Sequence, residues 1–179
     1  MFFEEETIST ERIYEGAILN LRRDKVTIHS GGTSYREIVE HNGGAVAVPI
    51  TAEGKVVMVR QYRKALERPV LELPAGKIEK GEEPLQTIIR ELAEETGYTA
   101  GNLEFLTAFY PSVGYTNEVL YIYLATDLTP GPTNYDDHEA MDMLEVDFEE
   151  AHNMVVRGEI RDAKTMLGIL LAKIQIEKT

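Results

Sequence analysis

Glu91, Glu94 and Glu95 lie close together in the chain, beside Arg90 and after a further acid at Glu82. Residues three and four apart share one face of a helix, so we expect the oxygens of the three glutamates to converge on a small patch. Crowded carboxylates repel one another unless a cation lies between them. Because all-oxygen clusters suit hard ions, this cluster predicts a site for Mg²⁺, with Mn²⁺ as a possible substitute.

The same residues have a simpler interpretation, in which the glutamates form the solvated face of an amphipathic helix. Arg90 would then form only a weak surface ion pair. The metal site is favoured because the cluster is part of a longer spacing pattern, which also includes Gly76, Glu82 and Gly97.

The run from Gly76 to Tyr98 resembles the signature of the Nudix hydrolases, Gly-x5-Glu-x7-Arg-Glu-U-x-Glu-Glu-x-Gly-U, in which U is a bulky aliphatic residue. Tyr98 stands where an aliphatic residue is usual, and we expect it to fill the same space. The matching positions are Gly76, Glu82, Arg90, Glu91, Leu92, Glu94, Glu95 and Gly97.

The resemblance implies a role for each residue of the cluster. Glu91, Glu95 and the backbone carbonyl of Ala75 would bind the metal, and Glu94 would bind it directly or through water. Arg90 would orient the carboxylates. Glu82 could join the metal site or, near the helix start, favour the helix dipole.

The general base must come from elsewhere, because the helix carboxylates are committed to metal. By the resemblance it is Glu139, in the acidic stretch Asp136-Asp137-His138-Glu139, with Asp137 and His138 as the next candidates. The alternative is that this stretch is only a solvated acidic loop.

Four further stretches resemble the ADP-ribose pyrophosphatase branch of the family. Enzymes of that branch are homodimers whose N-terminal strands contact the partner subunit, and we expect the same here. Arg63 would bind the diphosphate and Arg36 would contribute from the other subunit, since arginine suits bidentate phosphate recognition. The stretches are residues 36–41, 60–63, 72–76 and 162–165.

The loop from Ser112 to Glu118 resembles the substrate loop of that branch. Gly114 would approach the substrate, and Glu118 would contact a ribose. Val113 replaces the usual loop proline and Pro111 precedes it, so the loop can differ in shape. This leaves other nucleoside diphosphate sugars open as substrates.

Composition narrows the class of protein. A chain of 179 residues that is 43% hydrophobic and 27% charged is typical of a globular protein, and its net charge of −13 argues against nucleic acid or an anionic membrane as the main partner. Without cysteine, no disulfide or thiolate chemistry is available. The acidic N-terminus lacks the pattern of a secretory signal, so we expect a cytoplasmic protein.

Turn signals and apolar runs predict an α+β fold, with a mixed β-sheet between helices in an α/β/α sandwich. Residues 1–42 are predicted to form a small antiparallel meander for dimerisation, and residues 43–179 the hydrolase domain. Leu85, Ile88, Ile89 and Leu92 are predicted to bury one face of the signature helix while its glutamates face away. Strands are expected at 18–21, 25–29, 35–40, 45–50, 55–62, 70–73, 103–110, 119–124 and 141–146, and helices from about 82, at 148–157 and at 162–174.

The function predicted is Mg²⁺-dependent hydrolysis of a nucleoside diphosphate sugar, preferably ADP-ribose, to AMP and ribose 5-phosphate. GDP-mannose and NADH remain alternative substrates. A non-catalytic ligand sensor is disfavoured because the signature carboxylates are all present. A Ca²⁺-binding scaffold is disfavoured because no EF-hand type loop is found.

Overall fold

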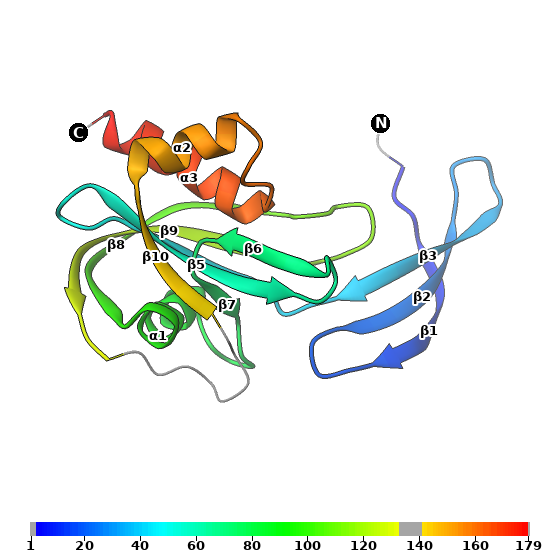
Figure 1. The fold of residues 1–179 in the computed structure, drawn as a ribbon. Helices are drawn as coiled ribbons and strands as arrows, with labels where there is room; N and C mark the ends of the chain where they lie inside the picture. Colours follow the sequence, from blue (N-terminus) through cyan, green and yellow to red (C-terminus); the bar gives the residue numbers. More distant parts are fainter. Residues whose placement is uncertain (1–2, 133–140, 179) are drawn as a thin grey trace. The chain divides into compact units, whose positions relative to one another are not determined.

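The computed structural model describes residues 3–132 and 141–178, which divide into two compact units. Of the described residues, unit 1 comprises 3–43 and 110–119, and unit 2 comprises 44–109, 120–132 and 141–178. The α+β class and the N-terminal antiparallel strands are as predicted (Figure 1). None of the helices in the described ranges is long and apolar enough to cross a membrane.

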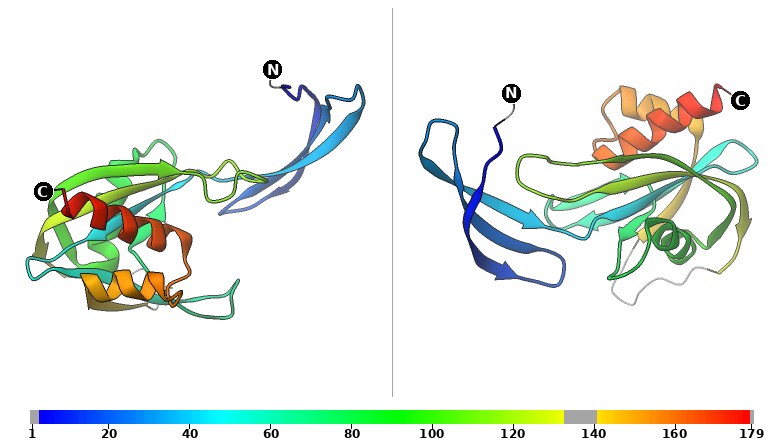
Figure 2. Two further views of the ribbon diagram at one scale, coloured as in Figure 1. Left: turned by 90° about the horizontal axis from the view of Figure 1, so that it is seen from above. Right: turned by 180° about the vertical axis from the view of Figure 1, so that it is seen from behind.

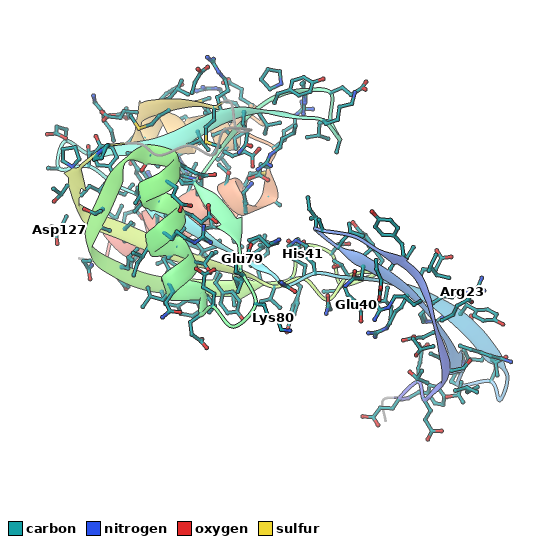
Figure 3. All side chains as sticks on the ribbon, turned by 90° about the horizontal axis from the view of Figure 1, so that it is seen from below. Arg23, Glu40, His41, Glu79, Lys80 and Asp127 are labelled. Atoms are coloured by element: carbon teal, nitrogen blue, oxygen red, sulfur yellow. The ribbon has the colours of Figure 1, made fainter. Side chains whose placement is uncertain are left out.

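Unit 1 is built on a three-stranded antiparallel meander, β1 (Thr7–Glu15), β2 (Asn20–Thr27) and β3 (Thr33–Glu40). Gly31, with φ of 84°, allows the turn between β2 and β3. Figure 3 marks Arg23 on β2 and Glu40 at the end of β3. The segment 110–119 attaches to the end of β3, because the Val39 N–H donates to the Tyr115 carbonyl at 2.8 Å.

The strand limits predicted in this unit were partly wrong. The ranges 18–21 and 25–29 are not two strands: one continuous strand, β2, runs from Asn20 to Thr27 and covers part of each range. β1 was not predicted as a strand of its own, since all nine of its residues are exposed and carry no one-sided burial pattern.

Unit 2 contains two sheets. The first has the order β10-β5-β6 and is antiparallel. The second is mixed, with the order β7-β4-β9-β8, because β4 and β9 run parallel while the other pairs are antiparallel. The strands are β4 (Gly44–Pro49), β5 (Lys55–Arg63), β6 (Arg68–Glu72), β7 (Ala75–Lys77), β8 (Tyr98–Phe109), β9 (Leu120–Pro130) and β10 (Met141–Asp147).

Three helices cover the sheets of unit 2 from opposite sides. Figure 2 shows α2 (Phe148–Val156) and α3 (Ala163–Ile176) on one side, with α1 (Pro84–Thr96) on the other. β4 is buried along its whole length, so it forms the centre of both cores. This confirms the predicted arrangement of a mixed sheet between helices.

The signature helix α1 begins at Pro84 and ends before Gly97. Glu83 and Gln86 form a capping box at its start, and Gly97 adopts φ of 71° at its end, as a C-terminal glycine should. Ile88 and Leu92 are buried against β4 and β9.

Two predictions about the faces of α1 were wrong. Leu85 and Ile89 are exposed, at 43% and 52%, because the helix presents a narrow stripe to the sheet. Glu95 is only 5% exposed and does not lie on the solvent face, because its carboxylate meets the backbone of β7.

Candidate active site

Strand β7 and helix α1 bring two of the signature glutamates to one stretch of backbone. The Ala75 N–H donates a hydrogen bond to Glu95 Oε2 at 3.0 Å. The Glu91 carboxylate lies against the next residue, since a Cβ at Gly76 would fall 1.9 Å from Glu91 Oε1. Glycine is required at position 76 for that close approach.

Arg90 forms hydrogen bonds to three carboxylates of the signature, those of Glu82, Glu91 and Glu94. Its Nη1 donates to Glu91 Oε1 at 2.7 Å and to Glu94 Oε2 at 2.9 Å. Its Nε donates to Glu82 Oε1 at 3.2 Å. One guanidinium therefore orients three carboxylates, which is the geometry that its predicted orienting role needs.

Glu82 lies at the entrance of α1 and accepts from several donors. Besides Arg90, the Glu79 N–H and the Thr87 hydroxyl donate to its carboxylate, at 3.1 and 2.8 Å. Figure 3 marks Glu79 in the loop that leads from β7 to α1. The hydrogen bonds, that of Arg90 first, lower the pKa of Glu82 from 4.5 to about 2, so it is fully ionised at neutral pH.

The donor atoms around β7 fit a hard divalent cation. Glu91 and Glu95 supply carboxylate oxygens beside the backbone of residues 75–76, and the absence of a side chain at Gly76 lets the Glu91 carboxylate lie against that backbone. Within residues 3–132 and 141–178, however, no three acidic or histidine side chains are arranged as a metal site. Glu91 and Glu94 are bound by Arg90, and Glu95 by the Ala75 N–H, so the predicted ligand set of Ala75, Glu91, Glu94 and Glu95 stays a prediction.

Arg63, the predicted diphosphate contact, forms a bidentate ion pair with Glu72. Its Nε and Nη2 donate to the two carboxylate oxygens at 2.7 and 2.9 Å. These hydrogen bonds to Glu72 are the main reason that the Arg63 pKa is raised, and the negative charge of Glu95 adds a smaller contribution.

The N-terminus of α3 fixes the strand that leads into β7. The buried Thr165 hydroxyl accepts from the Leu73 N–H at 2.9 Å and donates to Asp162 Oδ2 at 2.6 Å. Asp162 also caps α3 through the Thr165 N–H at 3.1 Å. The backbone just before Ala75 is therefore tied to α3.

The other predicted binding residues belong to unit 1. Arg36 pairs with Glu5, its Nε donating to Glu5 Oε2 at 2.9 Å. Glu118 lies 3.4 Å from His41 Nδ1. Gly114 is exposed, and a Cβ there would meet nothing within 4 Å. Glu139, the predicted general base, lies outside the described residues.

Comparison with known proteins settles the family. The profile described as "NUDIX domain" matches residues 41–167. The chain belongs to the Nudix family. It is a Nudix hydrolase, as the signature predicted.

Two similar proteins come from bacilli. The "ADP-ribose pyrophosphatase" of Bacillus subtilis is 45% identical over 93% of this chain and 91% of that protein. The "Methanol dehydrogenase activator" of Bacillus methanolicus is 42% identical over 97% and 95% of the two chains.

A solved structure supports the fold. The "Crystal structure of ADP compounds hydrolase" superimposes with a TM-score of 0.88 and covers 99% of this chain and 97% of that one. Its sequence identity is 19%, so this likeness concerns the Nudix fold alone.

Two groups of residues were given no individual role by the sequence reasoning. One is the acid Glu72 with Lys164, which form an ion pair with each other, while Glu72 also binds Arg63. The other is the pair Asp162 and Thr165 at the start of α3. The sequence did hold a signal for Glu72: it is a charged residue within the apolar run 70–73, and a charge buried there needs a partner of opposite sign.

Proposed function

We propose that this Nudix hydrolase splits the diphosphate of ADP-ribose into AMP and ribose 5-phosphate with Mg²⁺. The observation that carries the proposal is the convergence of Glu91 and Glu95 on the backbone of Ala75 and Gly76. The relative from Bacillus subtilis, whose name specifies ADP-ribose, supports this choice of substrate.

In the proposed reaction each residue group has a distinct task. A bound Mg²⁺ would neutralise phosphate charge and lower the pKa of a water. Glu91, Glu95 and the Ala75 carbonyl would hold the ion, with Glu94 as a direct or water-mediated ligand. Arg90 keeps Glu91 and Glu94 in place through its two hydrogen bonds.

The remaining groups would bind the substrate and move the proton. Glu139 would accept the proton of the attacking water. Arg63 and Arg36 would bind the diphosphate, since their guanidinium groups match phosphate oxygens in pairs. Glu118 would contact a ribose hydroxyl, and Gly114 would let the loop backbone approach the substrate.

We also propose a homodimer in which residues 1–42 contact the partner and residues 43–179 carry the hydrolase chemistry. Arg36 would then act on the active site of the partner. Light scattering of the purified protein measures this state directly: a dimer mass is expected, and a monomer mass at assay concentration would contradict the arrangement.

The test is hydrolysis of a substrate panel by the purified protein with Mg²⁺. ADP-ribose, ADP-mannose, GDP-mannose, NADH and nucleoside triphosphates are compared by the phosphate released after phosphatase treatment. We expect ADP-ribose to give the highest kcat/KM. E95Q should abolish turnover while the thermal transition is retained, and full activity of E95Q would reject the metal role of Glu95.

The relative from Bacillus methanolicus supports a second candidate function, activation of a dehydrogenase. The similarity to that activator covers 97% of this chain, and this is the observation that favours the second function. Adding the purified protein and Mg²⁺ to purified methanol dehydrogenase, with E95Q as the control, tests it. A rise in dehydrogenase rate with the wild-type chain alone would support activation by hydrolysis.

A further inference from the structure

Glu72 is a buried carboxylate that has two cationic partners. Its side chain is 3% exposed, and Arg63 binds both of its oxygens. Lys164 Nζ also donates to Glu72 Oε2. Burial alone would raise the pKa of Glu72, but these two cations outweigh it and hold the pKa below its ordinary value. If Arg63 leaves, Lys164 still provides Glu72 with a cation, which it shares with Asp162.

The two cations are held differently. Lys164 is 13% exposed and also donates to Asp162 Oδ2 at 2.8 Å, so it is fixed at the start of α3. Arg63 is 44% exposed at the end of β5, and the hydrogen bonds that its side chain makes in the described part of the chain both go to Glu72. Arg63 can therefore turn away while Lys164 stays in place.

Arg63, Glu72 and Lys164 line one pocket with a volume of about 610 Å³. Arg68 and Arg161 line the same pocket. Arg68 is also the register partner of Arg63 on the neighbouring strand, and like charges placed opposite each other are unfavourable unless an anion lies near them. The same pocket is also lined by Glu72, Glu159 and Asp162, so its four cations exceed its three acids by one. In a chain of net charge −13, this local excess of positive charge favours an anionic ligand.

We propose that Lys164 is a positioning residue that keeps Glu72 neutralised, so that Arg63 can leave Glu72 and bind a phosphate group entering this pocket. The inference rests on the proposed function, because that phosphate belongs to the nucleoside diphosphate substrate. Without Lys164, the departure of Arg63 would leave a buried carboxylate with no cation, which is strongly unfavourable. Arg63 would then stay on Glu72 and bind substrate less well.

A purely structural ion-pair network predicts a different result. If Arg63 served only to neutralise Glu72, loss of Lys164 would lower stability and leave substrate affinity unchanged. The KM of a variant without Lys164 therefore distinguishes the two explanations, whereas its melting temperature does not.

The experiment measures steady-state hydrolysis of ADP-ribose with saturating Mg²⁺. For K164M we expect KM to rise about tenfold, which corresponds to about 1.4 kcal/mol of binding free energy. K164R should restore most of the affinity because it keeps the charge. K64M is the matched control, since Lys64 pairs with Glu67 on the exposed turn after β5 and does not line the pocket.

The double variant E72Q/K164M tests the release of Arg63 directly. A neutral amide at position 72 needs no cation, so KM should return to within about twofold of the wild-type value. K164Q is measured beside K164M because it keeps a hydrogen-bond donor, and melting curves exclude a folding defect. A wild-type KM in both single variants, or an unchanged high KM in the double variant, would overturn the proposal.

Calorimetric titration of the same variants with ADP separates this inference from the proposed reaction. If the wild-type chain hydrolyses no nucleoside diphosphate sugar, the proposed function fails, yet ADP binding still reports on Arg63. Weaker ADP binding by K164M that recovers in E72Q/K164M supports the role of Lys164. Equal ADP binding by the wild type, K164M and E72Q/K164M rejects it.

Discussion

The Glu91 carboxylate occupies the space that a side chain at Gly76 would fill, because a Cβ there would lie 1.8 Å from the Glu91 carboxyl carbon. Gly76 and Glu91, both residues of the Nudix signature, therefore pack directly against each other. The glycine keeps the helix carboxylate on the strand backbone, where the metal is proposed to bind.

G76A is therefore expected to displace Glu91. We predict at least a tenfold loss of kcat/KM, and a loss of stability of about 1–3 kcal/mol from overpacking. G32A is the matched control, because a Cβ at Gly32 meets its nearest neighbour, Ile28, at an ordinary 3.6 Å. Wild-type hydrolysis by G76A would show that the position of Glu91 is not required.

Replacement of Arg90 by lysine should impair the site although the charge remains. A lysine amine cannot reproduce the fork with which Arg90 contacts Glu82, Glu91 and Glu94. We expect kcat/KM for ADP-ribose to fall about tenfold or more, and more Mn²⁺ to be needed for half-maximal activity. R157K, at an exposed ion pair on the end of α2, should change neither quantity.

Glu82 should make stability depend on acid pH. Its pKa is about 2 in the folded chain against an ordinary 4.5, so the folded state binds its proton less readily than the unfolded state. Its contribution is complete above about pH 5 and is lost as the pH falls toward 2. The urea midpoint of E82Q should therefore change less than that of wild type between pH 5 and pH 3, and equal changes would contradict this.

Thr165 should stabilise the fold through its hydroxyl. T165V keeps the shape but leaves the Leu73 N–H without its acceptor and removes one of the donors to Asp162, at a cost of about 1–3 kcal/mol. T165S keeps the hydroxyl and should lose less. Urea denaturation of both variants measures the difference, and equal midpoints would contradict the prediction, because the lost methyl group would then matter as much as the hydrogen bonds.

Arg36 provides a test of the proposed dimer. If it acts on the partner's site, mixing and refolding R36A with E95Q should produce hybrid dimers with one complete site. Activity should then exceed that of either variant alone, up to about one quarter of wild type, since half of the dimers are hybrids with one working site each. No recovery after subunit exchange would place Arg36 in the site of its own chain or outside it.

The sequence was sufficient for the Nudix assignment and most of unit 2. Spacing reveals the signature because each of its residues must occupy one position relative to the helix turn and the preceding strand. Apolar runs such as 45–50 reveal buried strands, and Gly97 marks the helix end, since these signals are local. Local patterns failed for β1, whose residues are all exposed.

The tertiary structure decided which side chains meet. Glu95 could not be placed on β7 from helix periodicity alone, because its partner, the Ala75 N–H, lies twenty residues earlier. The contact of Lys164 with Glu72 joins residues ninety-two positions apart, and no local signal reports such a pair. Sequence specifies the chemical groups and their local conformation, whereas burial and long-range hydrogen bonds depend on how α1 and α3 pack against the sheets.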